Sequence, residues 1–182
     1  MTGSERKIKD GVADLYNSLQ KWKNVHTSGI NIVNTIANIK LQHIYNVEEE
    51  DKLGKNKIPV ELEDPCNELK TVIQKLEKIV KKLELVVSMF IGVRKLEQHL
   101  GDDSVLFQTW TMDEYVTSGR SLVAMYKEEL KLKELIYQNI CHAKDRNSMM
   151  FYTSSWLHQP YISDNNELIM NSLLLETGHK KL

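Results

Sequence analysis

The densest group of chemically capable side chains lies near the C-terminus, in the stretch WLHQPY. Its members are Trp156, Leu157, His158, Gln159, Pro160 and Tyr161. Two aromatic rings, an imidazole and an amide in one short stretch could form the wall of a catalytic pocket, a clamp for a ligand, a docking surface for another protein, or a chain reversal held by its aromatic rings. A hydrolase would need the imidazole as its base, but no partner at catalytic spacing accompanies it.

The other residues that could do chemistry are scattered along the chain. The 6 histidines include no His-x-x-x-His pair, and the 2 cysteines, Cys66 and Cys141, lie far apart, so the sequence predicts no metal site. Glycine-rich phosphate loops and the Gly-x-Ser-x-Gly elbow of serine hydrolases are absent from the sequence. We therefore expect no catalytic residues and no cofactor. We also expect two unpaired thiols in a reducing, intracellular setting.

Charge and hydropathy exclude further classes of function. The 182 residues carry 24 basic and 25 acidic side chains, a net charge of -1. No global positive field is present, so we expect no direct sequence-specific binding of nucleic acid. No run of 18 apolar residues predicts a membrane span, and the N-terminus lacks the apolar segment of a secretory signal.

The periodicity of the sequence predicts helices throughout. We expect an all-α fold, an elongated helical bundle or coiled coil of three long helices followed by a short C-terminal helical hairpin, in a single domain over 1–182. The predicted segments are a first long helix over 5–44, a mobile loop over 45–63, a second helix over 64–101, a third helix over 111–144, and a helical hairpin over 148–182.

The first predicted helix shows an apparent change of register. From Ile8 to Trp22, apolar residues recur at alternating spacings of four and three. Beyond that point we interpret Val25, Gly29 and Ile32 as the beginning of a second such series, out of phase with the first. The sequence therefore predicts one bent helix, or two helices in tandem, with the bend or break near 27–29.

The second predicted helix is long and carries a broad apolar stripe. Asp64 is a suitable N-cap, Pro65 suits the first helical position, and Gly101 is a natural stop. A helix of this length spans roughly 54 Å, which exceeds the core of a compact globule, so we expect one stripe to pair with a helix outside the chain. The stretch KKLEL resembles a motif that docks on cyclins, although Leu83 lies inside the stripe and is expected to be buried.

Local signals also mark the ends of the later helices. Thr111 and Glu114 have the spacing of a capping box, in which each side chain hydrogen-bonds the backbone N–H of the other residue. Trp110 and Tyr115 flank this box at the positions of a hydrophobic staple. Gly178 is placed to cap the last helix in the left-handed conformation.

The C-terminal sequence resembles a known family. WLHQPY and the later LLLETGHKKL are similar to the C-terminus of the cyclin-dependent kinase 2-interacting protein family. Weaker matches in the first and third predicted helices extend the resemblance over nearly the whole chain, apart from the loop over 45–63. These matches lie at 6–10, 13–14, 21–22, 36–38, 106–107, 109–110, 125–126 and 130–133.

The resemblance implies a non-enzymatic nuclear adaptor in DNA replication, the cell cycle and the DNA damage checkpoint. The partners it implies are a cyclin-dependent kinase with its cyclin, an origin-firing kinase, the origin recognition complex and the ATR-interacting protein. It also implies a place in a AAA-type ATPase complex with a second small helical subunit, acting on chromatin and in ribosome maturation. The family offers no catalytic residues to transfer to this chain.

Three functions remain open from the residues themselves. The first is an adaptor that pairs through its long stripes, with WLHQPY as a partner-binding segment. The second is a structural coiled-coil homodimer, and the third is a small hydrolase with a site around His158. For WLHQPY itself, a chain reversal pinned by Trp156 and a docking surface both remain open.

Overall fold

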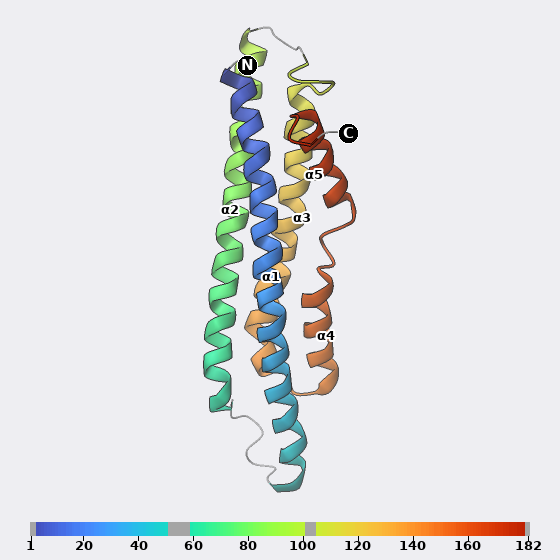
Figure 1. The fold of residues 1–182 in the computed structure, drawn as a ribbon. Coiled ribbons are helices and arrows are strands. Elements are labelled where there is room, and N and C mark those ends of the chain that lie inside the picture. The colour runs from blue at the N-terminus through green and yellow to red at the C-terminus, as the bar shows by residue number, and fades with distance from the viewer. Residues whose placement is uncertain (1–2, 51–58, 101–104, 181–182) are drawn as a thin grey trace. The chain divides into compact units, whose positions relative to one another are not determined.

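The computed structural model describes residues 3–50, 59–100 and 105–180 (Figure 1). Its elements are α1 (Gly3–Glu50), η1 (Val60–Leu62), α2 (Glu63–Leu100), α3 (Met112–Asn139), η2 (Ile140–His142), α4 (Arg146–His158) and α5 (Asn165–Glu176). No strand occurs among the described residues. The predicted all-α fold is therefore confirmed.

The connection between the first two helices differs from the prediction. α1 ends at Glu50, so the first residues of the predicted loop are helical. The 3₁₀ turn η1 leads directly into α2 at Glu63, and Asp64 therefore lies inside the first turn of α2 and not at its N-cap. Residues 51–58 of the predicted loop and the predicted stop at Gly101 lie outside the described residues.

The buried face of α1 keeps one register along the helix. Its buried positions are separated alternately by four and three residues: Ile8, Val12, Leu15, Leu19, Trp22, His26, Gly29, Val33 and Ile36. The predicted change of register is therefore wrong, and of the two alternatives for 27–29 the structure has one uninterrupted helix. The prediction fails because the polar His26 occupies a seam position, and the partly buried Val25 and Ile32 each lie one position before the seam residues His26 and Val33.

The long apolar stripes are filled within the chain. The stripe of α2 is buried from Leu69 to Val93, and Leu83, the leucine of the KKLEL stretch, is 0% exposed. α3 buries its own seam from Met112 to Ile136, and Ile140 of η2 continues it. These burials contradict the expectation that one of the long stripes must pair with a helix outside the chain.

The chain divides into two compact units. The first unit consists of Met1–Trp22, Lys78–Glu128 and Tyr161–Leu182, and the second unit consists of Lys23–Glu77 and Glu129–Pro160. α1, α2 and α3 contribute residues to both units, whereas α4 belongs to the second unit and α5 to the first. The predicted pairing of the two C-terminal helices in a hairpin stays a prediction.

In the first unit, the start of α3 is largely built as the sequence predicts. The rings of Trp110 and Tyr115 meet edge to face with centroids 5.4 Å apart, which confirms the hydrophobic staple. The Glu114 carboxylate accepts a hydrogen bond from the Thr111 N–H at 2.5 Å. The Thr111 hydroxyl differs from the prediction, because it donates to that carboxylate at 3.1 Å and does not accept from the Glu114 N–H.

The end of α5 is held to the segment that precedes α3. The Glu176 carboxylate accepts hydrogen bonds from the N–H and hydroxyl of Thr109 and from the N–H of Trp110. Burial alone would raise the pKa of Glu176, but these hydrogen bonds outweigh it and hold the pKa below its usual value. Gly178 has φ 69° and donates to the Leu175 carbonyl, which confirms the predicted left-handed cap.

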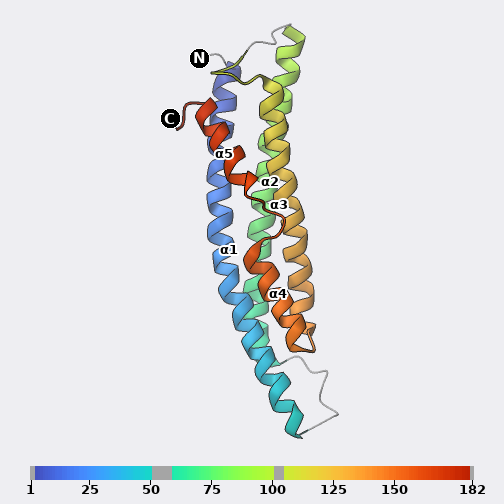
Figure 2. The ribbon, with the colours of Figure 1, turned by 90° about the vertical axis from the view of Figure 1, so that its right-hand side faces the viewer.

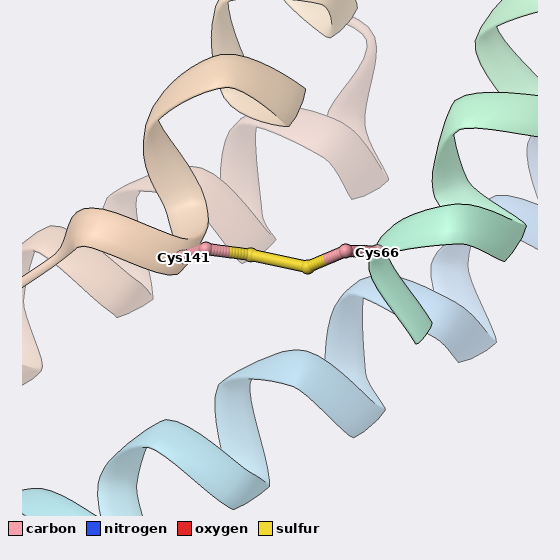
Figure 3. Close-up of a disulfide and its surroundings, with 2 residues drawn as sticks. All are labelled: Cys66 and Cys141. Atoms are coloured by element: carbon pink, nitrogen blue, oxygen red, sulfur yellow. A yellow bond between two sulfur atoms is a disulfide. The ribbon is translucent and has the colours of Figure 1, made fainter. Parts of the chain in front are cut away.

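In the second unit, a disulfide links α2 to the end of α3. Cys66 in the first turn of α2 is bonded to Cys141 in η2 (Figure 3). The expectation of two unpaired thiols is therefore wrong. The two cysteines are 75 residues apart in sequence, and only the antiparallel course of α2 and α3 brings these ends of the helices together.

Candidate protein-interaction site on α4

Local signals define α4 at both ends. The Asp145 carboxylate accepts hydrogen bonds from the N–H and the hydroxyl of Ser148, each at 2.8 Å, and so caps the first turn. These bonds hold the pKa of Asp145 below its usual value. The helix ends at His158, and the residue that follows, Gln159, has a φ of 46°. The left-handed conformation there is consistent with the proline that follows, because Pro160 disfavours right-handed helical dihedrals at the residue before it.

Trp156 fixes α4 to α1 inside the second unit. Its side chain is 0% exposed, and its indole N–H donates to the His26 carbonyl at 3.4 Å. The ring lies against Gly29, where an added Cβ would sit 2.4 Å from a ring carbon. Only glycine allows this approach, because any other residue would place a side-chain atom where the indole lies. Figure 2 shows α4 beside the corresponding part of α1.

A buried lysine lies over the same ring. Lys133 of α3 is 0% exposed, and its ammonium is 4.3 Å from the centroid of the Trp156 ring. The ammonium donates to the Trp156 carbonyl at 3.2 Å, contacts Nδ1 of His26 at 3.2 Å, and pairs with the Glu129 carboxylate at 3.1 Å. An ammonium has three N–H donors, and three acceptors surround this one.

Burial governs the ionisation of this cluster. Burial and, to a lesser extent, the charge of Lys133 lower the pKa of His26 to about 4, against a backbone hydrogen bond to Leu157 that raises it. The imidazole is therefore neutral near pH 7, with Nδ1 accepting from Lys133. Burial also lowers the pKa of Lys133 to about 8, although the Glu129 carboxylate opposes this shift. Lys133 is enclosed and fully engaged, so the cluster is suited to holding three helices together and not to reacting with a substrate.

Sequence reasoning missed this cluster, although a signal for it exists. The buried seam of α3 is spaced by alternating steps of four and three: Leu122, Tyr126, Glu129, Lys133, Ile136 and Ile140. The apolar residues Leu130 and Tyr137 attract attention instead, but both are only partly buried. Charged residues at two seam positions interrupt the apolar pattern, and a strict heptad count would have identified them as buried.

The outer side of α4 is apolar and exposed. Met150, Phe151 and Leu157 are 54%, 59% and 50% exposed. Beside them, α1 and α4 enclose a cavity of about 190 Å³, lined by Ile30, Val33, Asn34, Thr153, Ser154, Trp156 and Leu157. Pockets for small molecules are typically about 300 to 1,000 Å³, so this cavity suits a single apolar side chain of a protein partner.

The members of WLHQPY do not converge on one point. Trp156 is buried, which agrees with its interpretation as a pin, whereas Leu157, His158 and Pro160 are exposed. Gln159 forms the left-handed end of α4, and the chain passes from the second unit to the first between Pro160 and Tyr161. Their role in partner binding stays a prediction.

The described residues offer neither a metal site nor a membrane-spanning helix. No cluster of three or more His, Cys, Asp or Glu side chains there could hold a metal ion. In the same part of the chain, no helix is both long and apolar enough to cross a membrane.

Comparison with known proteins decides the family. No family model matches the chain. The cyclin-dependent kinase 2-interacting protein of Xenopus laevis is 36% identical over 196 residues, covering 100% of this chain and 93% of the relative. Its counterparts in Homo sapiens and Mus musculus are 35% and 36% identical, covering 98% of this chain and 92% of each relative.

The chain belongs to the cyclin-dependent kinase 2-interacting protein family. Because the matches extend over nearly the whole length of both sequences, they include α4 and the residues that enclose Trp156. The resemblance seen in WLHQPY and in the first and third helices is thereby confirmed.

Proposed function

We propose that this chain is a non-enzymatic adaptor that binds a cyclin-dependent kinase complex through protein–protein contacts. The observation that carries the proposal is family membership over the whole chain, because the relatives are named for interaction with cyclin-dependent kinase 2. Such a name describes binding and not a reaction. The exposed apolar side chains of α4 supply a surface of the kind that protein partners cover.

The wider role follows from the resemblance to the family. We propose a nuclear location and a role in DNA replication, the cell cycle, and DNA damage checkpoint signalling and repair. The proposed partners include a cyclin, an origin-firing kinase, the origin recognition complex and the ATR-interacting protein. A AAA-type ATPase complex with a second small helical subunit completes the set, on chromatin and in ribosome maturation.

The kinase contact is proposed at α4 and not at the cyclin-docking motif in α2. Within KKLEL, Leu83 is fully buried in a continuous helix, whereas docking motifs of this kind bind as extended peptides. Leu157 and Met150 need no unfolding to reach a partner. Burial of the long stripes within the chain also argues against the alternative, a structural coiled-coil homodimer.

Direct binding tests the proposal. The purified chain is titrated against cyclin-dependent kinase 2, alone and with its cyclin, by biolayer interferometry. We expect the wild type to bind and Leu157→Asp to weaken binding at least tenfold. Leu85→Asp, which changes a leucine 70% exposed on α2, should bind like the wild type. Circular dichroism checks that both variants fold. Absence of binding by the wild type under both conditions would refute the proposal.

Light scattering of the purified chain tests the homodimer. A mass near 21.1 kDa identifies the monomer, and a concentration-independent mass of twice that value would favour the homodimer over the adaptor.

A further inference from the structure

Acidic residues are absent from one side of the second unit. α1 contains no Asp or Glu between Asp14 and Glu48, and none occurs from Arg146 to Ser163, which includes all of α4. The α2 and α3 parts of the same unit do carry carboxylates: Glu63, Asp64, Glu68, Glu77, Glu129 and Glu134. Charge is therefore segregated by helix, because neither residues 23–47 of α1 nor α4 carry an acidic side chain.

The two helices of this surface run antiparallel. Trp156 contacts His26 and Gly29, whereas Ile30 and Val33, farther along α1, line one cavity with the earlier α4 residue Thr153. The two helices therefore meet along their lengths, and the cavity of about 190 Å³ forms a groove between them.

Helical spacing places basic residues at both ends of this groove. On α1, Lys23, Ile30 and Asn34 share one face, because they are separated by seven and four residues. On α4, Arg146, Met150 and Leu157 share one face, separated by four and seven residues. Since the helices are antiparallel, the lysine lies toward one end and the arginine toward the other. We call this surface the α1–α4 groove.

The cations of the groove are available to a partner. Lys23 and Arg146 are exposed and form no ion pair with any described residue. The nearest carboxylate in the sequence, Asp145, is already engaged by Ser148. Glu61 does reach α1, where it lies 3.7 Å from His43, but His43 is nine residues from Asn34 and therefore points to the opposite side of the helix.

Other occupants fit this surface less well. A second copy of the chain, paired by a two-fold axis, would bring the same cations face to face. Nucleic acid needs a dense array of cations along its phosphates, whereas this groove has an apolar centre and a cation toward each end. A small molecule would find a cavity below the usual size.

We propose that the α1–α4 groove binds an acidic amphipathic helix of a protein partner, with one apolar side chain in the cavity and carboxylates at Lys23 and Arg146. Trp156 lies beside His26 and Gly29, so Arg146, ten residues earlier on the antiparallel α4, lies beside α1 about ten residues beyond them. The two cations are therefore about 20 to 24 Å apart along the groove, and the bound helix needs roughly four turns. Apolar residues spaced at i, i+3 or i+4, and i+7 would contact Met150 and Leu157. The inference rests on the proposed function only in that it takes the chain to bind proteins.

Selection from a random library tests this proposal. The full chain is immobilised and panned against displayed random 16-residue peptides, and enriched peptides are measured by fluorescence anisotropy. We expect enriched peptides to be net acidic with helical apolar spacing. We expect Leu157→Ser, and separately Lys23→Glu with Arg146→Glu, to weaken their Kd at least tenfold. The control Leu85→Ser should bind like the wild type.

Three results would overturn the proposal. They are no enrichment over an uncoated surface, enriched peptides without an excess of Asp and Glu, and equal affinity for the wild type and the groove variants. Circular dichroism verifies that the variants fold, which is expected because all the changed side chains are exposed. Kinase binding is measured separately. If the chain binds the kinase but the peptide selection fails, only the proposal that the α1–α4 groove binds an acidic helix is refuted. A successful selection without kinase binding refutes the kinase proposal alone.

Discussion

Gly29 provides the sharpest test of how the second unit is packed. A Cβ at this position would lie 2.4, 2.9 and 3.0 Å from three atoms of the Trp156 ring. The ring has little room to move, because its side chain is 0% exposed, its N–H is bonded to the His26 carbonyl, and the Lys133 ammonium lies 4.3 Å from its centroid. Gly29→Ala should therefore overpack the core between α1 and α4.

The magnitude follows from two opposing terms. Alanine in place of a helical glycine raises the free energy of unfolding by about 1 kcal/mol. Overpacking of a filled core costs about 1 to 3 kcal/mol, and three close contacts with a fixed ring place this site at the upper end of that range. Gly29→Ala should thus destabilise by about 2 kcal/mol, which corresponds to a fall in Tm of about 4 to 8 °C for a chain of this size.

A second glycine in a helix supplies the matched control. Gly92 lies within α2, and a Cβ there would meet nothing within 4 Å. Gly92→Ala should therefore raise the Tm by about 2 to 4 °C from helix propensity alone. Thermal unfolding is followed by far-UV circular dichroism for both variants. If Gly29→Ala is as stable as Gly92→Ala, the indole does not lie against α1 and the account of Trp156 as a pin fails.

Three further changes have defined outcomes. The pKa of His26 is about 4 in the folded chain against 6.5 unfolded, so stability is lost as pH falls from 6.5 to 4, by about 3 kcal/mol. His26→Gln should flatten this part of the urea-midpoint profile, and an unchanged slope would contradict the assignment. Reduction of the Cys66–Cys141 disulfide opens a link across 75 residues, and chain entropy predicts a loss of up to about 4.5 kcal/mol. Dithiothreitol should lower the Tm of the wild type but not of Cys66→Ser with Cys141→Ser, and equal shifts would argue against the bond. Gln159→Gly should relieve the left-handed backbone and gain up to about 1 kcal/mol, whereas Gln159→Val should cost at least as much; a Tm order opposite to this would refute the conformation at the end of α4.

Much of the fold could be read from side-chain type alone. The helices, the buried stripe of α2, the Trp110–Tyr115 staple and the Gly178 cap were all predictable, because each depends on residues within a few turns of one another. The C-terminal stretch that carries Trp156 also pointed to the family that full-length comparison shows.

The errors in predicting the buried faces of α1 and α3 share one cause. His26 and Lys133 each interrupt an apolar series on their own helix, so each one taken alone resembles a surface residue. Together with Glu129 they lie around Trp156, where Lys133 hydrogen-bonds His26 and forms an ion pair with Glu129. These interactions offset the free-energy cost of burying polar and charged groups. The role of Gly29 is of the same kind, since its missing side chain has meaning only when an indole from α4 fills the space.

Sequence by itself determined the helical class, the start of α3, the end of α5 and the family, because periodicity, capping residues and a nearly full-length match are properties of a linear chain. Tertiary structure decided the register of α1, the disulfide and the buried cluster, because each depends on residues 23 to 130 positions apart meeting in space. It also supports the proposal of where a partner binds. The apolar stripes that seemed to need an outside helix are filled within the chain, which leaves the exposed side of α4 and the α1–α4 groove as the candidate surface.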